Sequence, residues 1–167
     1  YFVTGVQTCA LPISGSTQIV FTGLNGDEDE EYLLEMDYAF ANANPDADIV
    51  IKPNNVSTNQ ASTMFRSYTS GTGNQATSTL AIVSGCFTRA ISGYTRVVLK
   101  AKTGLKRRYD AVGVYNADDN TGLLKFSGGG YWNNTIDLIT SLVITCTNYT
   151  FAATARLWKK IPLDGGE

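Results

Sequence analysis

The chain has 167 residues, with 13 basic and 15 acidic side chains and no histidine, so its formal net charge is −2. This length suits one domain with a core of its own. The slight acidity argues against a nucleic-acid-binding protein, and the lack of histidine removes the commonest general base and metal ligand. No stretch approaches the roughly eighteen apolar residues of a membrane-spanning helix, so no membrane span is predicted.

The first fourteen residues, YFVTGVQTCALPIS, resemble a translated sequencing adapter. The adapter codons, read in one frame, spell Val3 to Ile13 and then open the serine codon of residue 14. We therefore expect residues 1–14 to be a non-native adapter artefact from a metagenome assembly, and residues 15–167 to form a single domain. Outside this segment only Cys86 and Cys146 remain, and we expect two free thiols because two cysteines make no disulfide scaffold.

Short runs rich in Thr, Val, Ile and Tyr, separated by Gly, Asn and Asp, predict many β-strands. From residue 32 to 41, Leu34, Met36, Tyr38 and Phe40 occur at every second position, which favours a half-buried strand. A helix is the competing interpretation there, because Glu, Leu and Met are good helix formers. In this half of the chain we also expect strands at 17–24, 48–52 and 63–69, a turn at 25–27 and a Ser/Gly/Asn-rich loop at 70–75.

The second half of the chain shows the same pattern of short β-prone runs separated by turn residues. Thr103-Gly104 predicts the turn of a hairpin, and the three glycines at 128–130 predict a flexible loop. Strands are expected at 77–84, 94–102, 106–115, 136–145 and 154–161, with a turn at 118–122. Nine or ten strands at turn spacings of about ten residues predict an all-β protein, an antiparallel β-sandwich of jelly-roll-like type.

Charge is divided between two blocks of the chain. Residues 15–51 contain nine acids and no base, whereas residues 52–109 contain nine bases and no acid. Such blocks attract each other, either within one molecule or between copies; two solvated faces without pairing are the alternative. The expected electrostatic assembly patch comprises Asp27, Glu28, Asp29, Glu30, Glu31, Lys100, Lys102, Lys106, Arg107 and Arg108.

A second candidate site follows the three glycines. Tyr131, Trp132, Asn133 and Asn134 combine aromatic rings with amides, as sugar-binding loops do; the alternative is that Trp132 packs in the core. The acidic residues 27–31 offer oxygen ligands to calcium, but Tyr32 stands where an EF-hand has glycine, so no metal site is assigned. No nucleophile motif, P-loop or metal-ligand spacing occurs, so no catalytic residue or cofactor is assigned and no enzyme activity is expected. A carboxylate pair for glycoside hydrolysis leaves no local motif and stays open.

Three segments carry a family resemblance. They are the turn 23–27 with the strand from Tyr32, the run 49–55 (IVIKPNN), and 132–144 (WNNTIDLITSLVI) followed by 155–159 (ARLWK). Residues 15–161 thereby resemble the small β-sandwich proteins of tailed-phage virions that are described as tail-fibre or structural proteins. Residues 153–155 (ATA) depart from the Gly-Ser pair that is common at this place in the group.

The resemblance implies a non-enzymatic phage virion protein, structural or receptor-binding, and a location in the extracellular particle. It also implies a homo-oligomer, with a trimer the most plausible, or contacts with other virion proteins, and binding to a host surface glycan. It therefore favours pairing of the two charge blocks between copies of the chain. No nucleic acid is expected as a partner. The alternative function is a secreted carbohydrate-binding β-sandwich module from a larger enzyme.

Overall fold

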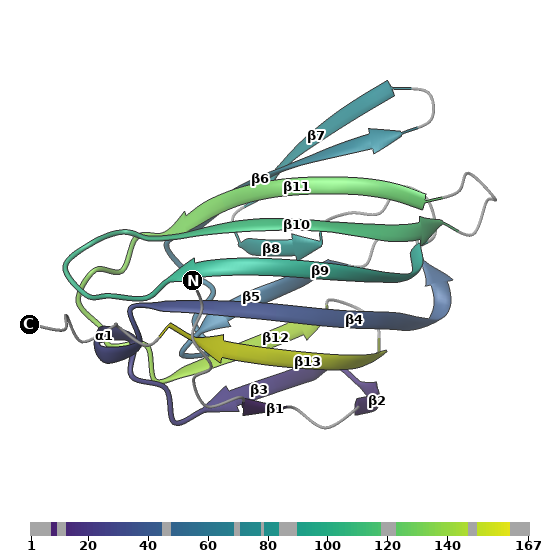
Figure 1. The fold of residues 1–167 in the computed structure, drawn as a ribbon. Helices are drawn as coiled ribbons and strands as arrows, with labels where there is room; N and C mark the ends of the chain where they lie inside the picture. Colours follow the sequence, from purple (N-terminus) through teal and green to yellow (C-terminus); the bar gives the residue numbers. More distant parts are fainter. Residues whose placement is uncertain are drawn as a thin grey trace, which may run out of the picture.

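The computed structural model shows two antiparallel β-sheets packed face to face (Figure 1). It describes residues 8–9, 13–44, 48–68, 71–77, 79–83, 90–117, 123–146 and 150–160. The prediction of an all-β antiparallel sandwich is confirmed, while the strand orders do not confirm a jelly-roll connectivity. The described part contains no helix long and apolar enough to cross a membrane.

The larger sheet has nine strands in the order β1-β13-β4-β9-β10-β11-β6-β7, and β2 also pairs with β13. Two short strands from the adapter-like end of the chain, β1 and β2, thus lie along the outer edge of β13. The strand bounds are β1 Thr8–Cys9, β2 Ile13–Ser16, β4 Glu31–Asn44, β6 Gln60–Tyr68, β7 Gly71–Thr77, β9 Ala90–Lys100, β10 Arg107–Ala117, β11 Leu123–Trp132 and β13 Phe151–Lys159.

The smaller sheet has four strands in the order β3-β12-β5-β8 and covers one face of the larger sheet (Figure 1). Its strands are β3 Gln18–Thr22, β5 Ile49–Pro53, β8 Leu80–Val83 and β12 Ser141–Cys146. The short helix α1, Gly26–Asp29, connects β3 to β4 at one end of the sandwich. This end carries the candidate site described below.

The core lies between the two sheets, and β4 shows why the chain folds this way. Its even-numbered residues from Tyr32 to Phe40 are each at most 6% exposed and face the smaller sheet. Ile19, Ile51 and Ile144 of the smaller sheet are equally buried. A strand of alternating character buries one whole face between two sheets, so the strand prediction for residues 32–41 is confirmed and the helical alternative is wrong.

Two predicted loops are strands. Residues 71–77 form β7, and Gly128–Gly130 lie inside β11. A Cβ atom at Gly128 would collide with Met64 Sδ, and one at Gly130 with the backbone oxygen of Ala61, so β6 lies too close to β11 for any larger residue. The glycines therefore mark a close approach of neighbouring strands rather than a flexible loop.

Cys146 is buried, as expected, and is not part of a disulfide in the described part of the chain, whereas Cys86 lies outside the described residues. The predicted turn at 118–122 also lies outside them. The strand predicted at 136–145 begins only at Ser141, because residues 133–140 form a loop at the α1 end of the sandwich.

Candidate binding site at the α1 end of the sandwich

Three connections meet at the α1 end: the turn that contains α1, the β9–β10 connection and the β11–β12 loop. The backbone N–H of Ala101 donates to the Glu30 carbonyl at 2.8 Å, and that of Gly104 donates to the Thr135 carbonyl at 2.8 Å. Gly26 N–H donates to the Ile139 carbonyl at 3.1 Å. Each connection is therefore hydrogen-bonded to another, which gives the site a fixed frame.

The acidic turn, residues 25–31, begins with a capped helix. Asn25 is the N-cap of α1, and its side chain accepts a hydrogen bond from the Glu28 N–H at 3.4 Å. The carboxylate of Asp29 accepts from the Asn25 N–H at 3.0 Å and from the Tyr32 hydroxyl at 2.5 Å, and it pairs with Lys159 at 3.1 Å. Burial, with the hydrogen bond to Asp29, raises the pKa of Tyr32. Asp29 thus anchors α1 to β4 and β13.

The acidic turn also binds the basic hairpin, residues 100–108. Asp27 accepts hydrogen bonds from the Thr103 N–H at 2.7 Å and the Thr103 hydroxyl at 3.0 Å, and these bonds lower the pKa of Asp27. Glu30 pairs with Lys102 at 2.6 Å; the hydrogen bond between them lowers the pKa of Glu30 and raises that of Lys102. Glu31 pairs with Lys100 across the β4–β9 register.

The two charge blocks therefore meet within one chain at these residues, whereas the prediction favoured pairing between copies. The side chain of Glu28 has no partner among the described residues, and its backbone N–H caps α1. The side chains of Lys106 and Arg108 have no carboxylate partner in the part of the chain that the structure describes. The predicted patch thus divides into paired acids and partly unpaired bases.

Arg107 does not belong to a surface patch, so its assignment to the assembly patch is wrong. It is 1% exposed, its guanidinium carbon lies 5.4 Å from the centre of the Trp132 ring, and it donates to the backbone carbonyls of Ala101 (3.4 Å) and Asp137 (2.5 Å). Burial lowers its pKa. The inward-facing Tyr109 and Ala111 share its side of β10, and this alternation was the signal that could have revealed it.

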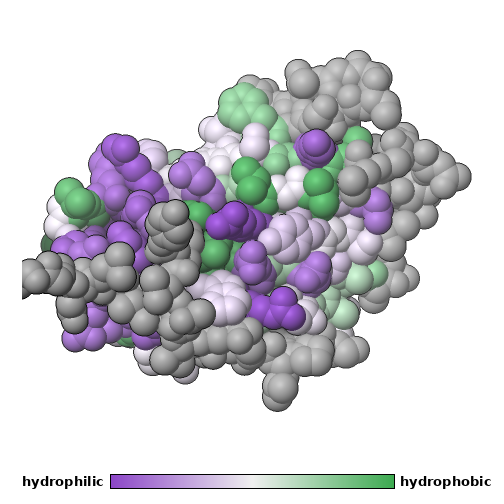
Figure 2. Space-filling model, in the orientation of Figure 1, coloured by the Kyte–Doolittle hydropathy of each residue, from purple (hydrophilic) through white to green (hydrophobic). Residues whose placement is uncertain are grey.

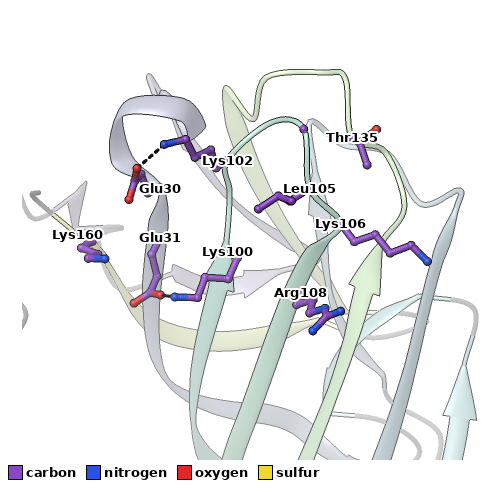
Figure 3. Close-up of a pocket in the computed structure, with 10 residues that line it drawn as sticks. Glu30, Glu31, Lys100, Lys102, Leu105, Lys106, Arg108, Thr135 and Lys160 are labelled. Atoms are coloured by element: carbon purple, nitrogen blue, oxygen red, sulfur yellow. Dashed lines mark hydrogen bonds and ion pairs between the residues drawn. The ribbon is translucent and has the colours of Figure 1, made fainter.

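The connections enclose a hollow of about 690 Å3 on the outer side of the larger sheet (Figure 3). In that view Leu105, 68% exposed, lies between the two ion pairs on one side and Lys106 and Arg108 on the other. Hydrophilic side chains dominate this end of the molecule in Figure 2. The lining consists of five cations, two carboxylates and three uncharged residues, namely Lys100, Lys102, Lys106, Arg108, Lys160, Glu30, Glu31, Gly104, Leu105 and Thr135.

The structure separates the four residues of the other predicted site. Trp132 is 0% exposed and packs in the core, so the assignment of Trp132 to a ligand-binding surface is wrong. The side-chain oxygen of Asn134 accepts from the N–H groups of Ile136 and Asp137, both at 3.0 Å, and so shapes the loop. Tyr131, at 39% exposure, and Asn133 remain at the surface.

Tyr131 and Asn133 lie beside the basic hairpin. Arg108 is opposite Tyr131 in the β10–β11 register, and Arg107 is opposite Trp132. Lys106 directly precedes β10 and Asn133 directly follows β11 at the same end of this strand pair. The Lys106 ammonium lies 4.9 Å from the centre of the Tyr131 ring. The structure thus joins two residues of each predicted site into one group, the recognition quartet: Lys106, Arg108, Tyr131 and Asn133.

Two contributors to the site were missed in the sequence. Lys160 lines the hollow and donates its backbone N–H to the Glu31 carbonyl at 3.0 Å. Asn54, in a left-handed conformation (φ 51°), accepts hydrogen bonds from the N–H groups of Thr140 and Ser141 and donates to the Leu138 carbonyl at 2.7 Å. The Asn54-Asn55 pair after a strand was the available signal, since asparagine tolerates this conformation.

Metal binding finds no support in the described part of the chain, where no three metal-ligating side chains gather. No protein-family model matches the chain, and no curated protein or solved structure matches it either. The residues of the hollow and the recognition quartet are therefore the features of this chain that indicate a function.

Proposed function

We propose that this chain is a non-enzymatic receptor-binding protein of a phage virion that binds a surface glycan through the recognition quartet. The observation that carries the proposal is the exposed ring of Tyr131 between Arg108 on the neighbouring strand and the exposed amide of Asn133. The virion setting comes from the family resemblance of residues 15–161.

The chemistry of the quartet suits a sugar. A pyranose ring presents an apolar face that packs on an aromatic ring, and its hydroxyl groups need hydrogen-bond donors and acceptors at the edge of that ring. Tyr131 supplies the ring, Asn133 supplies both a donor and an acceptor, and Arg108 supplies donors in a fixed plane. Tyrosine offers this contact area with little loss of conformational entropy.

The outer face also supports a binding role rather than a catalytic one. Glu35, the carboxylate in the middle of β4, accepts hydrogen bonds from the Tyr94 hydroxyl at 3.0 Å and the Trp158 indole N–H at 3.3 Å. The register places it between Arg96 and Arg156. Both carboxylate oxygens of Glu35 are thus engaged by side chains of the protein, which favours a structural role for Glu35 over a place in a carboxylate pair for glycoside hydrolysis.

The test is a glycan array probed with the intact protein and with two matched variants. We expect Tyr131→Ala to weaken binding by roughly tenfold, as loss of an aromatic stacking contact does. Phe65→Ala is the control, because Phe65 is an exposed aromatic residue (56%) on the same face, on β6. The proposal is wrong if no glycan binds, or if both variants lose binding equally.

The particle setting needs a separate measurement, because a secreted carbohydrate-binding module would use the same quartet. Antibodies against the chain should label purified phage particles in electron microscopy. If the antibodies instead label a secreted enzyme that degrades polysaccharides, the alternative function is favoured, and the proposal of glycan binding still stands.

A further inference from the structure

We infer that the ligand of this site is an acidic polysaccharide, whose carboxylate or sulfate groups bind the cations of the hollow. The inference rests on the proposed function and names its ligand class. Five cations and two carboxylates line the hollow, and Glu30 and Glu31 already pair with Lys102 and Lys100. Lys106, Arg108 and Lys160 have no carboxylate within ion-pair distance among the described residues.

The charged residues and Tyr131 form a row across the ends of five neighbouring strands, β13, β4, β9, β10 and β11. Lys160 follows β13 and lies beside Glu31 of β4, Glu31 faces Lys100 of β9, and the β9–β10 register places Arg108 next to Lys100. Tyr131 of β11 completes the row. Four strand spacings make this transverse row about 19 Å long, so a linear polymer laid across the strand ends meets all of it.

The mixture of groups selects an acidic sugar polymer among polyanions. Arg108 matches the planar geometry of a carboxylate or sulfate, while Leu105 and Tyr131 offer apolar contact to sugar rings. Glu30 and Glu31 still accept hydrogen bonds from hydroxyl groups, which sugars have in abundance. A nucleic-acid backbone offers few hydroxyl donors to these two carboxylates, and the carboxylates repel its phosphates. One exposed tyrosine also makes a poor platform for stacked bases.

The experiment measures binding of the full chain to polygalacturonate, heparin and neutral dextran, with a single-stranded oligonucleotide and phosphatidylglycerol vesicles for comparison. Lys106→Glu and Arg108→Glu should each weaken polygalacturonate or heparin binding by roughly tenfold or more, since each loses a charge-assisted hydrogen bond. Lys125→Glu is the matched control, because Lys125 is an exposed lysine on the same strand and face as Tyr131. It should change the dissociation constant by less than about twofold. Binding should also weaken with added salt, because screening acts within about 10 Å at 0.1 M.

The outcomes separate the two claims. If the chain binds dextran, if Tyr131→Ala abolishes that binding and if the charge reversals leave it unchanged, the acidic ligand is overturned and the proposed function stands. Lack of binding to any glycan would overturn both claims. Equal affinity for the oligonucleotide or the vesicles, unaffected by Tyr131→Ala, would show unspecific attraction of polyanions and overturn the acidic polysaccharide.

Discussion

The acidic turn and the basic hairpin carry opposite charges at the same end of the sandwich, but they use them differently. In the turn, Asp27, Asp29, Glu30 and Glu31 each contact a partner, either a backbone N–H, a hydroxyl or a lysine. In the hairpin, the outward-facing Lys106 and Arg108 have no carboxylate partner among the described residues. The turn therefore holds the frame together, while the hairpin leaves charge available to a ligand.

Side-chain length explains this division. The short carboxylates of Asp27 and Asp29 stay close to the backbone, where they bind the N–H groups of Thr103 and Asn25. Lysine and arginine side chains extend further from the backbone, and those of the exposed Lys106 and Arg108 can keep their charged ends in solvent. Opposite charge blocks in a sequence thus need not neutralise each other completely when they meet.

Arg107 is the exception in the hairpin, and replacing it should have the largest effect. Arg107→Ala removes two hydrogen bonds to backbone carbonyls and the contact with Trp132, so we expect a loss of roughly 3 kcal/mol in the free energy of unfolding. Urea denaturation followed by tryptophan fluorescence measures it. The control is Arg108→Ala, one residue away on the exposed face, which should cost less than about 0.5 kcal/mol. Equal losses would show that both arginines are structural.

Asp29 tests the acidic turn in the same way, with a smaller expected effect. Asp29→Asn keeps the volume but weakens the hydrogen bond from Tyr32 and removes the ion pair with Lys159, for an expected loss of roughly 2 kcal/mol. Thermal unfolding by circular dichroism provides the measurement. Glu28→Gln serves as the control, because the Glu28 side chain is exposed; a melting temperature unchanged in both variants would contradict the anchoring role.

Acid should produce the smallest effect. The folded-state pKa values of Asp27 and Glu30 are lowered from their ordinary 3.8 and 4.5, so their contribution to stability is complete above those values and is lost as the pH falls through the lowered ones. We expect hydrogen exchange at the Thr103 amide to gain an extra acceleration on acidification between about pH 5 and pH 2, relative to the core amides. Asp27→Asn should abolish this difference; a difference that persists in the variant would contradict the assignment.

The sequence predicted those parts of the fold that depend on local alternation. Leu34, Met36 and Tyr38 occur at every second position, and this pattern alone requires a strand with one buried face. The glycines of β11 were misinterpreted because their reason lies in Met64 and Ala61, which are distant in sequence. The residues of the recognition quartet were predicted in two separate sites, because only the pairing of β10 with β11 places Tyr131 beside Arg108.

The bond between Asn25 and Gly26 has a consequence for the chemical lifetime of the protein. An asparagine followed by glycine deamidates when the glycine nitrogen attacks the asparagine side chain. Here the Gly26 N–H is held by the Ile139 carbonyl at 3.1 Å, and the Asn25 side chain is held by the Glu28 N–H. The reaction therefore has to wait for local opening of the α1 turn. Deamidation of Asn25 is therefore expected to be slow. Its rate, followed as the gradual increase in mass of a stored sample, reports how often this end of the sandwich opens.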